Sequence, residues 1–460
     1  MTFASLGLID PLLRTLDDLD YRTPTPVQKE AIPAVLKGRD LLAAAQTGTG
    51  KTAGFALPLL QKLTLEGPRV ASNSVRALAL APTRELAEQV LQSVQRYGAN
   101  LPLRSYAVYG GVSINPQMMA LRKGVDVLVA TPGRLLDLYR QNAVRFEQLQ
   151  VLVLDEADRM LDLGFARELD ALFAALPKKR QTLLFSATYP PGIEGLAGRF
   201  MRNPQQVVIE ETEVRNPISQ RFYEVSAEQR LPAVLRLLAA ERPQPCMVFC
   251  QTRQQCQQLQ QLLNGNRVSA LALHGDMEQR ERDQVLALFA NQSCSVLVAT
   301  DVAARGIDIE GVAAVINAEL SPDPAVHTHR IGRSGRAGQP GLALSLVTPA
   351  EQGRARRIEE ALGEPLNWAS LDRLPEHLDK PLLPPMRTLA VAGGRKDKVR
   401  PGDLLGALTG EAGLPGDAIG KISISDFQAL VAVRWDLAQT ALERLEQGKI
   451  KGRRFKVRLL

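Results

Sequence analysis

Two short segments contain residues whose types and order suit chemistry on a phosphorylated ligand. Residues 45–52 read Ala-Gln-Thr-Gly-Thr-Gly-Lys-Thr, and residues 155–158 read Asp-Glu-Ala-Asp. In such a loop small residues let backbone N–H groups turn toward phosphate oxygens, while its lysine and last hydroxyl reach the phosphates and a Mg²⁺ ion. Neighbouring carboxylates suit the metal and an attacking water. Together the segments predict a magnesium–nucleotide site for ATP hydrolysis.

Each predicted role follows from side-chain chemistry. Lys51 supplies a point charge to the β- and γ-phosphates, Thr52 and Asp155 hold the metal, and Glu156 orients or deprotonates the attacking water. The loop begins with Ala45 where the strict pattern has glycine, and we expect so small a side chain to be tolerated. The residues expected around the phosphates are Ala45, Gln46, Thr47, Gly48, Thr49, Gly50, Lys51 and Thr52.

Apolar runs that read as buried strands precede both segments and recur along the chain. In the first half they are residues 40–44, 77–81, 125–130, 151–154 and 182–185, and helical patterns lie between them. The second half repeats the design in residues 247–250, 270–273, 296–299, 313–317 and 343–347. Alternating strands and helices predict a parallel, doubly wound α/β sheet with ligands at the carboxyl ends of its strands. We therefore expect two tandem copies of this architecture.

Composition narrows the class of protein. At 460 residues and 45% apolar content, the chain can bury several hydrophobic cores. It has no long apolar stretch and no basic, then apolar, N-terminal segment, which argues against a membrane span or a secretory signal and for a cytoplasmic location. The cysteines, Cys246, Cys250, Cys256 and Cys294, lack the spacing of zinc ligands. We expect reduced, buried thiols.

Basic charge is concentrated at the C-terminal end. Residues 386–460 contain 14 Lys and Arg against 8 Asp and Glu, a net charge of +6 out of +7 for the whole chain. This excess indicates an anionic polymer as partner. The alternative is a basic face that is merely solvated. The basic residues expected to contact RNA are Lys396, Lys398, Arg400, Lys449, Lys451, Arg453 and Arg454.

The order of elements in this C-terminal segment is strand, helix, strand, strand, helix, strand. The predicted elements are residues 388–392, 403–408, 421–424, 430–434, 437–446 and 455–459, and their order resembles an RNA-recognition-motif sheet. The third strand lacks aromatic side chains where bases normally stack in that fold. We therefore expect the basic segments, rather than the sheet face, to bind RNA.

The motifs together resemble those of the DEAD-box RNA helicases over about 370 residues. Besides the two segments above, the resemblance rests on residues 24–28, 82–86, 110–111, 131–134, 186–188, 299–308 and 329–336. It implies two RecA-like domains, RNA-stimulated ATP hydrolysis, and ATP and Mg²⁺ as cofactors. It also implies a core that grips bent single-stranded RNA and so separates a duplex locally.

The resemblance also implies residue roles. Gln28 would bond the adenine edge with Phe3 and Tyr21 packed nearby, Asp308 would accept from the ribose hydroxyls, and Arg333 and Arg336 would act as arginine fingers. Asp20 stands where the family usually has glycine. Asp158, Ser186, Thr188 and His329 would couple phosphate state to domain closure, although Ser186 and Thr188 can also be read as strand-end caps. The implied RNA contacts of the core are Pro82, Thr83, Arg84, Gly110, Gly111, Thr131, Pro132, Gly133, Arg134, Thr300 and Arg305.

The domain arrangement most resembles the DbpA subgroup of that family. We expect helicase domains at residues 1–212 and 213–370, a proline-bearing linker at 371–385 and an RNA-binding domain at 386–460. The implied substrate is 23S ribosomal RNA in large-subunit assembly intermediates, acted on by a monomer with no membrane or DNA partner. Two alternatives stay open: an ATP-gated RNA clamp that does not separate strands, and a DNA translocase of the same superfamily.

Overall fold

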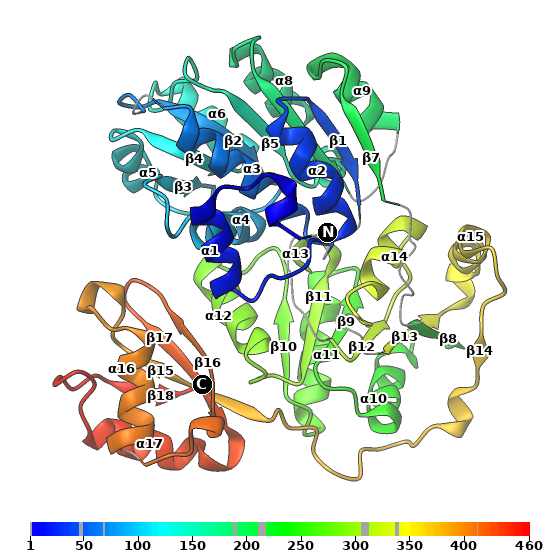
Figure 1. The fold of residues 1–460 in the computed structure, drawn as a ribbon. Coiled ribbons are helices and arrows are strands. Elements are labelled where there is room, and N and C mark those ends of the chain that lie inside the picture. Colours follow the sequence, from blue (N-terminus) through cyan, green and yellow to red (C-terminus); the bar gives the residue numbers. More distant parts are fainter. Residues whose placement is uncertain are drawn as a thin grey trace. The chain divides into compact units, whose positions relative to one another are not determined.

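A computed structural model describes residues 2–45, 49–67, 70–186, 191–209, 218–304, 312–335, 340–411 and 413–460. The chain forms two compact units, and the first contains a seven-stranded sheet of order β3-β4-β2-β5-β6-β1-β7 (Figure 1). All its strands pair in parallel. They are β1 (Leu41–Ala44), β2 (Val75–Leu80), β3 (Ser105–Val108), β4 (Val125–Ala130), β5 (Val151–Leu154), β6 (Gln181–Ser186) and β7 (Gln205–Val208).

Both faces of this sheet are buried, which explains why its central strands are continuous apolar runs. In β5, Val151 and Val153 pack into one cluster and Leu152 and Leu154 into another. The first cluster includes residues of α1 (Asp10–Asp18), α2 (Pro26–Leu36), α3 (Lys51–Leu65) and α4 (Arg84–Tyr97). The second includes residues of α5 (Ile114–Leu121), α6 (Pro132–Arg140), α7 (Ala157–Asp162), α8 (Ala166–Ala175) and α9 (Pro191–Phe200).

The second unit contains another seven-stranded parallel sheet, of order β10-β11-β9-β12-β13-β8-β14. Its strands are β8 (Ile218–Glu224), β9 (Cys246–Cys250), β10 (Ala270–Leu273), β11 (Val296–Thr300), β12 (Ala314–Asn317), β13 (Gly341–Val347) and β14 (Trp368–Ala369). The helices between them are α10 (Arg230–Glu241), α11 (Arg253–Gly265), α12 (Gln279–Ala290), α13 (Asp301–Ala304), α14 (Pro324–Ile331) and α15 (Gln352–Leu362).

These two sheets confirm the predicted α/β fold class. Every apolar run identified in the sequence corresponds to a strand of one sheet or the other. The sequence analysis missed β3, β7, β8 and β14, which lie at or next to a sheet edge. The domain boundaries stay predictions.

The segment expected to be a linker is bound along its length to the second sheet domain. Arg236 Nη2 donates to the carbonyls of Leu371 and Leu374 at 2.7 and 2.9 Å. Leu382 is 2% exposed and forms a parallel bridge with Val268. Gln244 Nε2 donates to the Leu383 carbonyl at 2.9 Å. Residues 371–385 therefore form a strap that packs against the second sheet domain.

The C-terminal domain is a four-stranded antiparallel sheet of order β16-β17-β15-β18. Its elements, β15 (Met386–Val391), α16 (Pro401–Gly406), β16 (Ile419–Ile424), β17 (Ala429–Arg434), α17 (Ala438–Gln447) and β18 (Val457–Leu459), confirm the predicted order. Leu389 and Val431 belong to its hydrophobic core. Thr388, which alternates with Leu389 along β15, lies on the opposite face. No described helix of the protein is long and apolar enough to span a membrane.

The cysteines are free and buried, as the sequence predicts. Burial raises the pKa of the Cys294 thiol to about 12, and a hydrogen bond with Cys256 raises the pKa of the Cys250 thiol. Because the thiolate is the reactive form, these thiols should be inert in the folded protein.

We predict that a thiol-reactive aromatic disulfide labels none of the cysteines of the native protein within minutes. In concentrated guanidinium chloride all four should react. The absorbance of the released thiolate reports both phases. Rapid labelling of one native cysteine would contradict the packing described here.

Candidate functional site

Strand order divides the carboxyl edge of the first sheet into two adjoining groups of predicted site residues. The segments after β1, β5 and β6, which are neighbours, contain the phosphate loop, the acidic cluster and Ser186. The segments after β2, β3 and β4, also neighbours, contain the predicted RNA contacts. The two groups meet where β2 pairs with β5, and there Asp155 N donates to the Leu80 carbonyl at 2.9 Å.

The end of the phosphate loop is fixed by a close approach of Gln28. Gly50 adopts a left-handed conformation with φ +84°, and a side chain there would overlap the Gln28 amide. Gln28 Nε2 donates to the Gly50 carbonyl at 3.1 Å, and its Oε1 accepts from Thr25 N at 2.9 Å. Gln28 therefore ties α2 to the phosphate loop. Its predicted contact with adenine is not tested by this geometry. Gln46, Thr47 and Gly48 lie outside the described residues.

Two polar side chains near the phosphate loop are buried without a hydrogen-bond partner among the described residues. They are the Lys51 ammonium, at the start of α3, and the Ser186 hydroxyl, at the end of β6. Lys51 is 6% exposed and Ser186 is fully buried. A buried ammonium without a hydrogen-bond partner costs several kcal/mol, so this position favours an anionic ligand.

The acidic cluster is equally buried. Burial raises the pKa of the Asp155 carboxyl to about 7, and the positive charge of Lys51 opposes part of that rise. Glu156 has a left-handed backbone, with φ +54°, which is uncommon for a residue with a long side chain and typical of functional sites. Asp158 is 5% exposed and its Oδ1 accepts from Arg159 N at 3.0 Å.

Arg159 is a site residue that the sequence analysis missed. Its Nη1 lies 2.9 Å from Glu156 Oε2, and both side chains are less than one-tenth exposed. The spacing of three residues across the first turn of α7 brings the two groups together, since such residues are neighbours on a helix surface. This three-residue spacing in the sequence could have identified Arg159 as a partner of Glu156.

The aromatic residues predicted near the base lie in or against the core of the first domain. Phe3 is 3% exposed, and Tyr21 meets the Tyr97 ring edge-on with 6.1 Å between ring centroids. Asp20 keeps the turn that glycine would make, because it adopts φ +56°, and its carboxylate pairs with Arg22 at 2.7 Å. The roles of Phe3 and Tyr21 at the base stay predictions.

The predicted RNA contacts of the first domain occupy loops and helix starts. Thr83 caps α4 by accepting from Leu86 N at 3.2 Å, and the Arg84 guanidinium lies 4.7 Å from the centroid of the Tyr109 ring. Arg134 Nη2 donates to the Val112 carbonyl at 3.0 Å, which links the segment after β4 to the segment after β3. The group comprises Pro82, Thr83, Arg84, Gly110, Gly111, Thr131, Pro132, Gly133 and Arg134.

In the second sheet domain, a buried arginine ties the carboxyl ends of two strands together. Arg330 is 2% exposed, binds both carboxylate oxygens of Asp301 at 2.6 and 2.8 Å, and donates to Asn317 Oδ1 at 3.1 Å. This network holds the segment after Thr300. Arg333, 6% exposed, and His329 lie near or just beyond the end of α14. Thr188, Arg305, Asp308 and Arg336 lie outside the described residues.

The two basic segments of the C-terminal domain lie side by side although they are far apart in sequence. Lys451 Nζ donates to the Lys398 carbonyl at 3.1 Å and lies 3.8 Å from Asp403 Oδ2. We call the exposed basic residues of these two segments the basic cluster. They are Lys396, Lys398, Arg400, Lys449, Lys451, Arg453 and Arg454.

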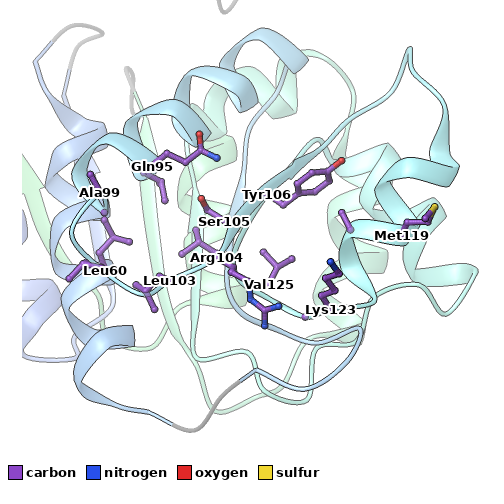
Figure 2. Close-up of a pocket in the computed structure, with 16 residues that line it drawn as sticks. Leu60, Gln95, Ala99, Leu103, Arg104, Ser105, Tyr106, Met119, Lys123 and Val125 are labelled. Atoms are coloured by element: carbon purple, nitrogen blue, oxygen red, sulfur yellow. The ribbon is translucent and has the colours of Figure 1, made fainter. Parts of the chain in front are cut away.

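A separate cavity of about 700 Å³ lies among α4, α5 and the amino ends of β3 and β4. Figure 2 shows Ser105, Val125 and Lys123 around it, together with Arg104. Because the predicted site lies at the carboxyl ends of the strands, this cavity is not part of it.

Three known families match successive parts of the chain, in the order of the two sheet domains and the C-terminal domain. Residues 25–196 match the DEAD/DEAH box helicase family, residues 229–338 match the helicase conserved C-terminal domain, and residues 388–459 match the DbpA RNA binding domain.

Similar proteins and structures agree with these matches. The chain is 46% identical to the ATP-dependent RNA helicase DbpA of Escherichia coli K12, over 100% of this chain and 99% of that protein. It is 42% identical to the DEAD-box ATP-dependent RNA helicase CshA of Bacillus cereus, over 82% of this chain and 71% of that protein. A structure of S. cerevisiae Dbp5 bound to RNA and ADP BeF3 covers 81% of this chain and 96% of that one, with a TM-score of 0.71 and 31% identity. The chain therefore belongs to the DEAD-box ATP-dependent RNA helicases, and within that family to the DbpA type.

Proposed function

We propose that this ATP-dependent RNA helicase remodels 23S ribosomal RNA during assembly of the large ribosomal subunit. The observation that carries the proposal is the clustering of two basic segments on a C-terminal domain that matches the DbpA RNA binding domain. Core contacts to the sugar-phosphate chain carry little sequence information, so a separate domain has to select the RNA. A basic cluster of this kind suits that task.

For ATP hydrolysis, the orphaned ammonium of Lys51 is placed to bind the β- and γ-phosphates. Thr52 and the buried carboxylate of Asp155 fit a Mg²⁺ ion, because Mg²⁺ takes one or two protein oxygens together with substrate phosphates and water. The chemistry it supplies there is neutralisation of phosphate charge. Gln28 would reach the adenine from α2, and Ser186 would sense the phosphate state through its unpartnered hydroxyl.

Glu156 is the candidate that orients or deprotonates the attacking water. One of its carboxylate oxygens lies 2.9 Å from Arg159 Nη1, and its backbone is left-handed at the start of α7. Arg333 and Arg336 of the second sheet domain are the proposed arginine fingers, and Asp308 the proposed ribose contact. An arginine side chain placed against the transferred phosphoryl group is worth about 10³ to 10⁵ in rate.

The competing function is an ATP-gated RNA clamp that does not separate strands. Two measurements decide between these functions. ATP hydrolysis should be faster with a 23S ribosomal RNA fragment than with a scrambled RNA of equal length, and equal rates would remove the targeting claim. In a strand-displacement assay the helicase releases the shorter strand, whereas a clamp hydrolyses ATP and releases none.

We predict that two substitutions at the nucleotide site affect different steps, ATP binding and turnover. Lys51→Ala should weaken ATP binding at least tenfold, because it removes the charge that faces the phosphates. Glu156→Gln should preserve ATP and RNA binding while turnover falls by about 10² to 10⁴, the usual contribution of a general base. Equilibrium binding of a fluorescent ATP analogue and steady-state phosphate release separate the two effects.

The matched control is Glu147→Gln, which makes the same isosteric change at an exposed carboxylate just before β5. It should leave binding and turnover unchanged. If Glu156→Gln retained full turnover, the hydrolytic role of Glu156 would be wrong.

A second prediction concerns the basic cluster. Replacing Lys396, Lys398 and Arg400 by alanine should weaken binding to the ribosomal RNA fragment and reduce the slope of log Kd against log salt by about one unit for each lost phosphate contact. A control triple that removes the exposed Arg356, Arg357 and Lys421 carries the same loss of charge outside the cluster. Equal effects of the two triples would show that only net charge matters.

A further inference from the structure

The turn between β16 and β17 presents an aromatic ring to solvent. Phe427 is 67% exposed, and the Lys396 ammonium lies 4.1 Å from the centroid of its ring. A single exposed apolar residue is ordinary. This ring differs because a cation is paired with it and because the backbone around both groups is fixed.

The turn and the neighbouring basic loop are held together by backbone hydrogen bonds. Arg395 N donates to the Ser425 carbonyl at 2.9 Å, and Lys396 N donates to the Asp426 carbonyl at 3.0 Å. Gly394 approaches these carbonyls so closely that any side chain would overlap them. The Arg395 guanidinium also donates to the Ile424 carbonyl at 3.0 Å. The ring and the ammonium are therefore presented together by a rigid scaffold.

Phe427 borders a cavity of about 670 Å³ on the sheet side of the domain. Ala390 and Ala392 leave room for it, Phe455 lies at its rim, and Lys456 and Arg458 add positive charge. Arg280 of α12 and Glu446 also line it. The cavity therefore combines aromatic rings, small residues and an excess of cations.

Part of this sheet face is already occupied by a contact with the second sheet domain. Thr388 is fully buried, its hydroxyl accepts from Asn291 Nδ2 at 2.8 Å, and it lies 2.8 Å from Ser293 Oγ. Asn291 and Ser293 belong to the turn that follows α12. The cavity lies at the other end of this face, near Ala390, Ala392 and Phe427.

We propose that this cavity is a subsite for one unpaired nucleobase of the RNA bound by the C-terminal domain. The base stacks on the Phe427 ring, and its flanking phosphates contact Lys396, Lys456 and Arg458. A flat base adjoining anionic phosphates matches both parts of the surface, whereas an acidic peptide would use the cations and leave the ring unpaired. The inference rests on the proposed RNA targeting and assigns the base contact to a ring that the sequence pattern does not mark.

The test measures equilibrium binding of the full-length protein to a 23S ribosomal RNA fragment. Loss of stacking on one base costs about 1–3 kcal/mol, so Phe427→Ala should raise Kd by about 5- to 150-fold. Phe427→Trp should restore affinity because it keeps an aromatic face. Lys396→Met should reduce the salt slope by about one unit, whereas Phe427→Ala should leave that slope unchanged.

The domain offers a matched control in Trp435. This ring is 37% exposed and also has a cation against it, with the Arg387 guanidinium 4.9 Å from the ring centroid. It lies at the opposite end of β17 from Phe427. Trp435→Ala should leave Kd within twofold of the parent. The weaker binding of Phe427→Ala would then come from loss of the subsite and not from loss of any exposed aromatic residue.

The outcomes separate this inference from the proposed function. Unchanged affinity in Phe427→Ala overturns the subsite, even if the protein still prefers the ribosomal fragment to a scrambled RNA. Equal affinity of the parent for both RNAs overturns the targeting instead, and the ratio of Phe427→Ala to parent on either RNA still decides the subsite. Competition by a polyglutamate peptide that is lost in Phe427→Ala would assign the cavity to a peptide and would also overturn the inference.

Discussion

The pairing of β2 with β5 is the constraint on which the proposed chemistry of the first domain depends. Neighbouring strands lie about 4.8 Å apart, and the carboxyl ends of parallel strands share one edge. The hydrogen bond from Asp155 N to the Leu80 carbonyl therefore connects the predicted nucleotide group to the strand that leads into Thr83 and Arg84. The segments that follow β2 and β5 therefore begin one strand spacing apart.

The charges at this edge are costly to the folded state. Lys51, Asp155, Glu156 and Arg159 are each less than one-tenth exposed, and the Lys51 ammonium has no hydrogen-bond partner among the described residues. A left-handed backbone at Glu156 adds about 1–3 kcal/mol of strain. Buried charge and strain of this kind are typical of functional sites, because a packed hydrophobic residue would stabilise the fold more. The two hydrophobic layers of the sheet offset this cost and hold the charged groups in place before any ligand binds.

The sequence predicts those features that are local or that repeat along the chain. Buried parallel strands appear as apolar runs, so the central strands of both large sheets could be identified, whereas β3, β7, β8 and β14, at or next to the sheet edges, gave no such signal. The sequence shows residues 371–385 only as a proline-bearing linker, and it gives no sign of their packing because the partners, Arg236 and Gln244, are more than a hundred residues away in sequence. The ion pair of Arg159 with Glu156 follows from helical spacing, but only once the start of α7 is known. Residue roles that require both large domains cannot be derived from either one alone.

The C-terminal domain shows why the usual aromatic pattern is absent from its third strand. Thr388 uses one end of the sheet face to contact Asn291 and Ser293, so aromatic side chains along the whole face would obstruct that contact. What remains for a ligand is the other end of the face, where a turn supplies the ring of Phe427 and a loop supplies the charge of Lys396. Turns and loops tolerate substitution better than the buried strands they connect. A recognition surface built on them can change its RNA target while the sheet, its contact with the second sheet domain and the ATP site keep their geometry.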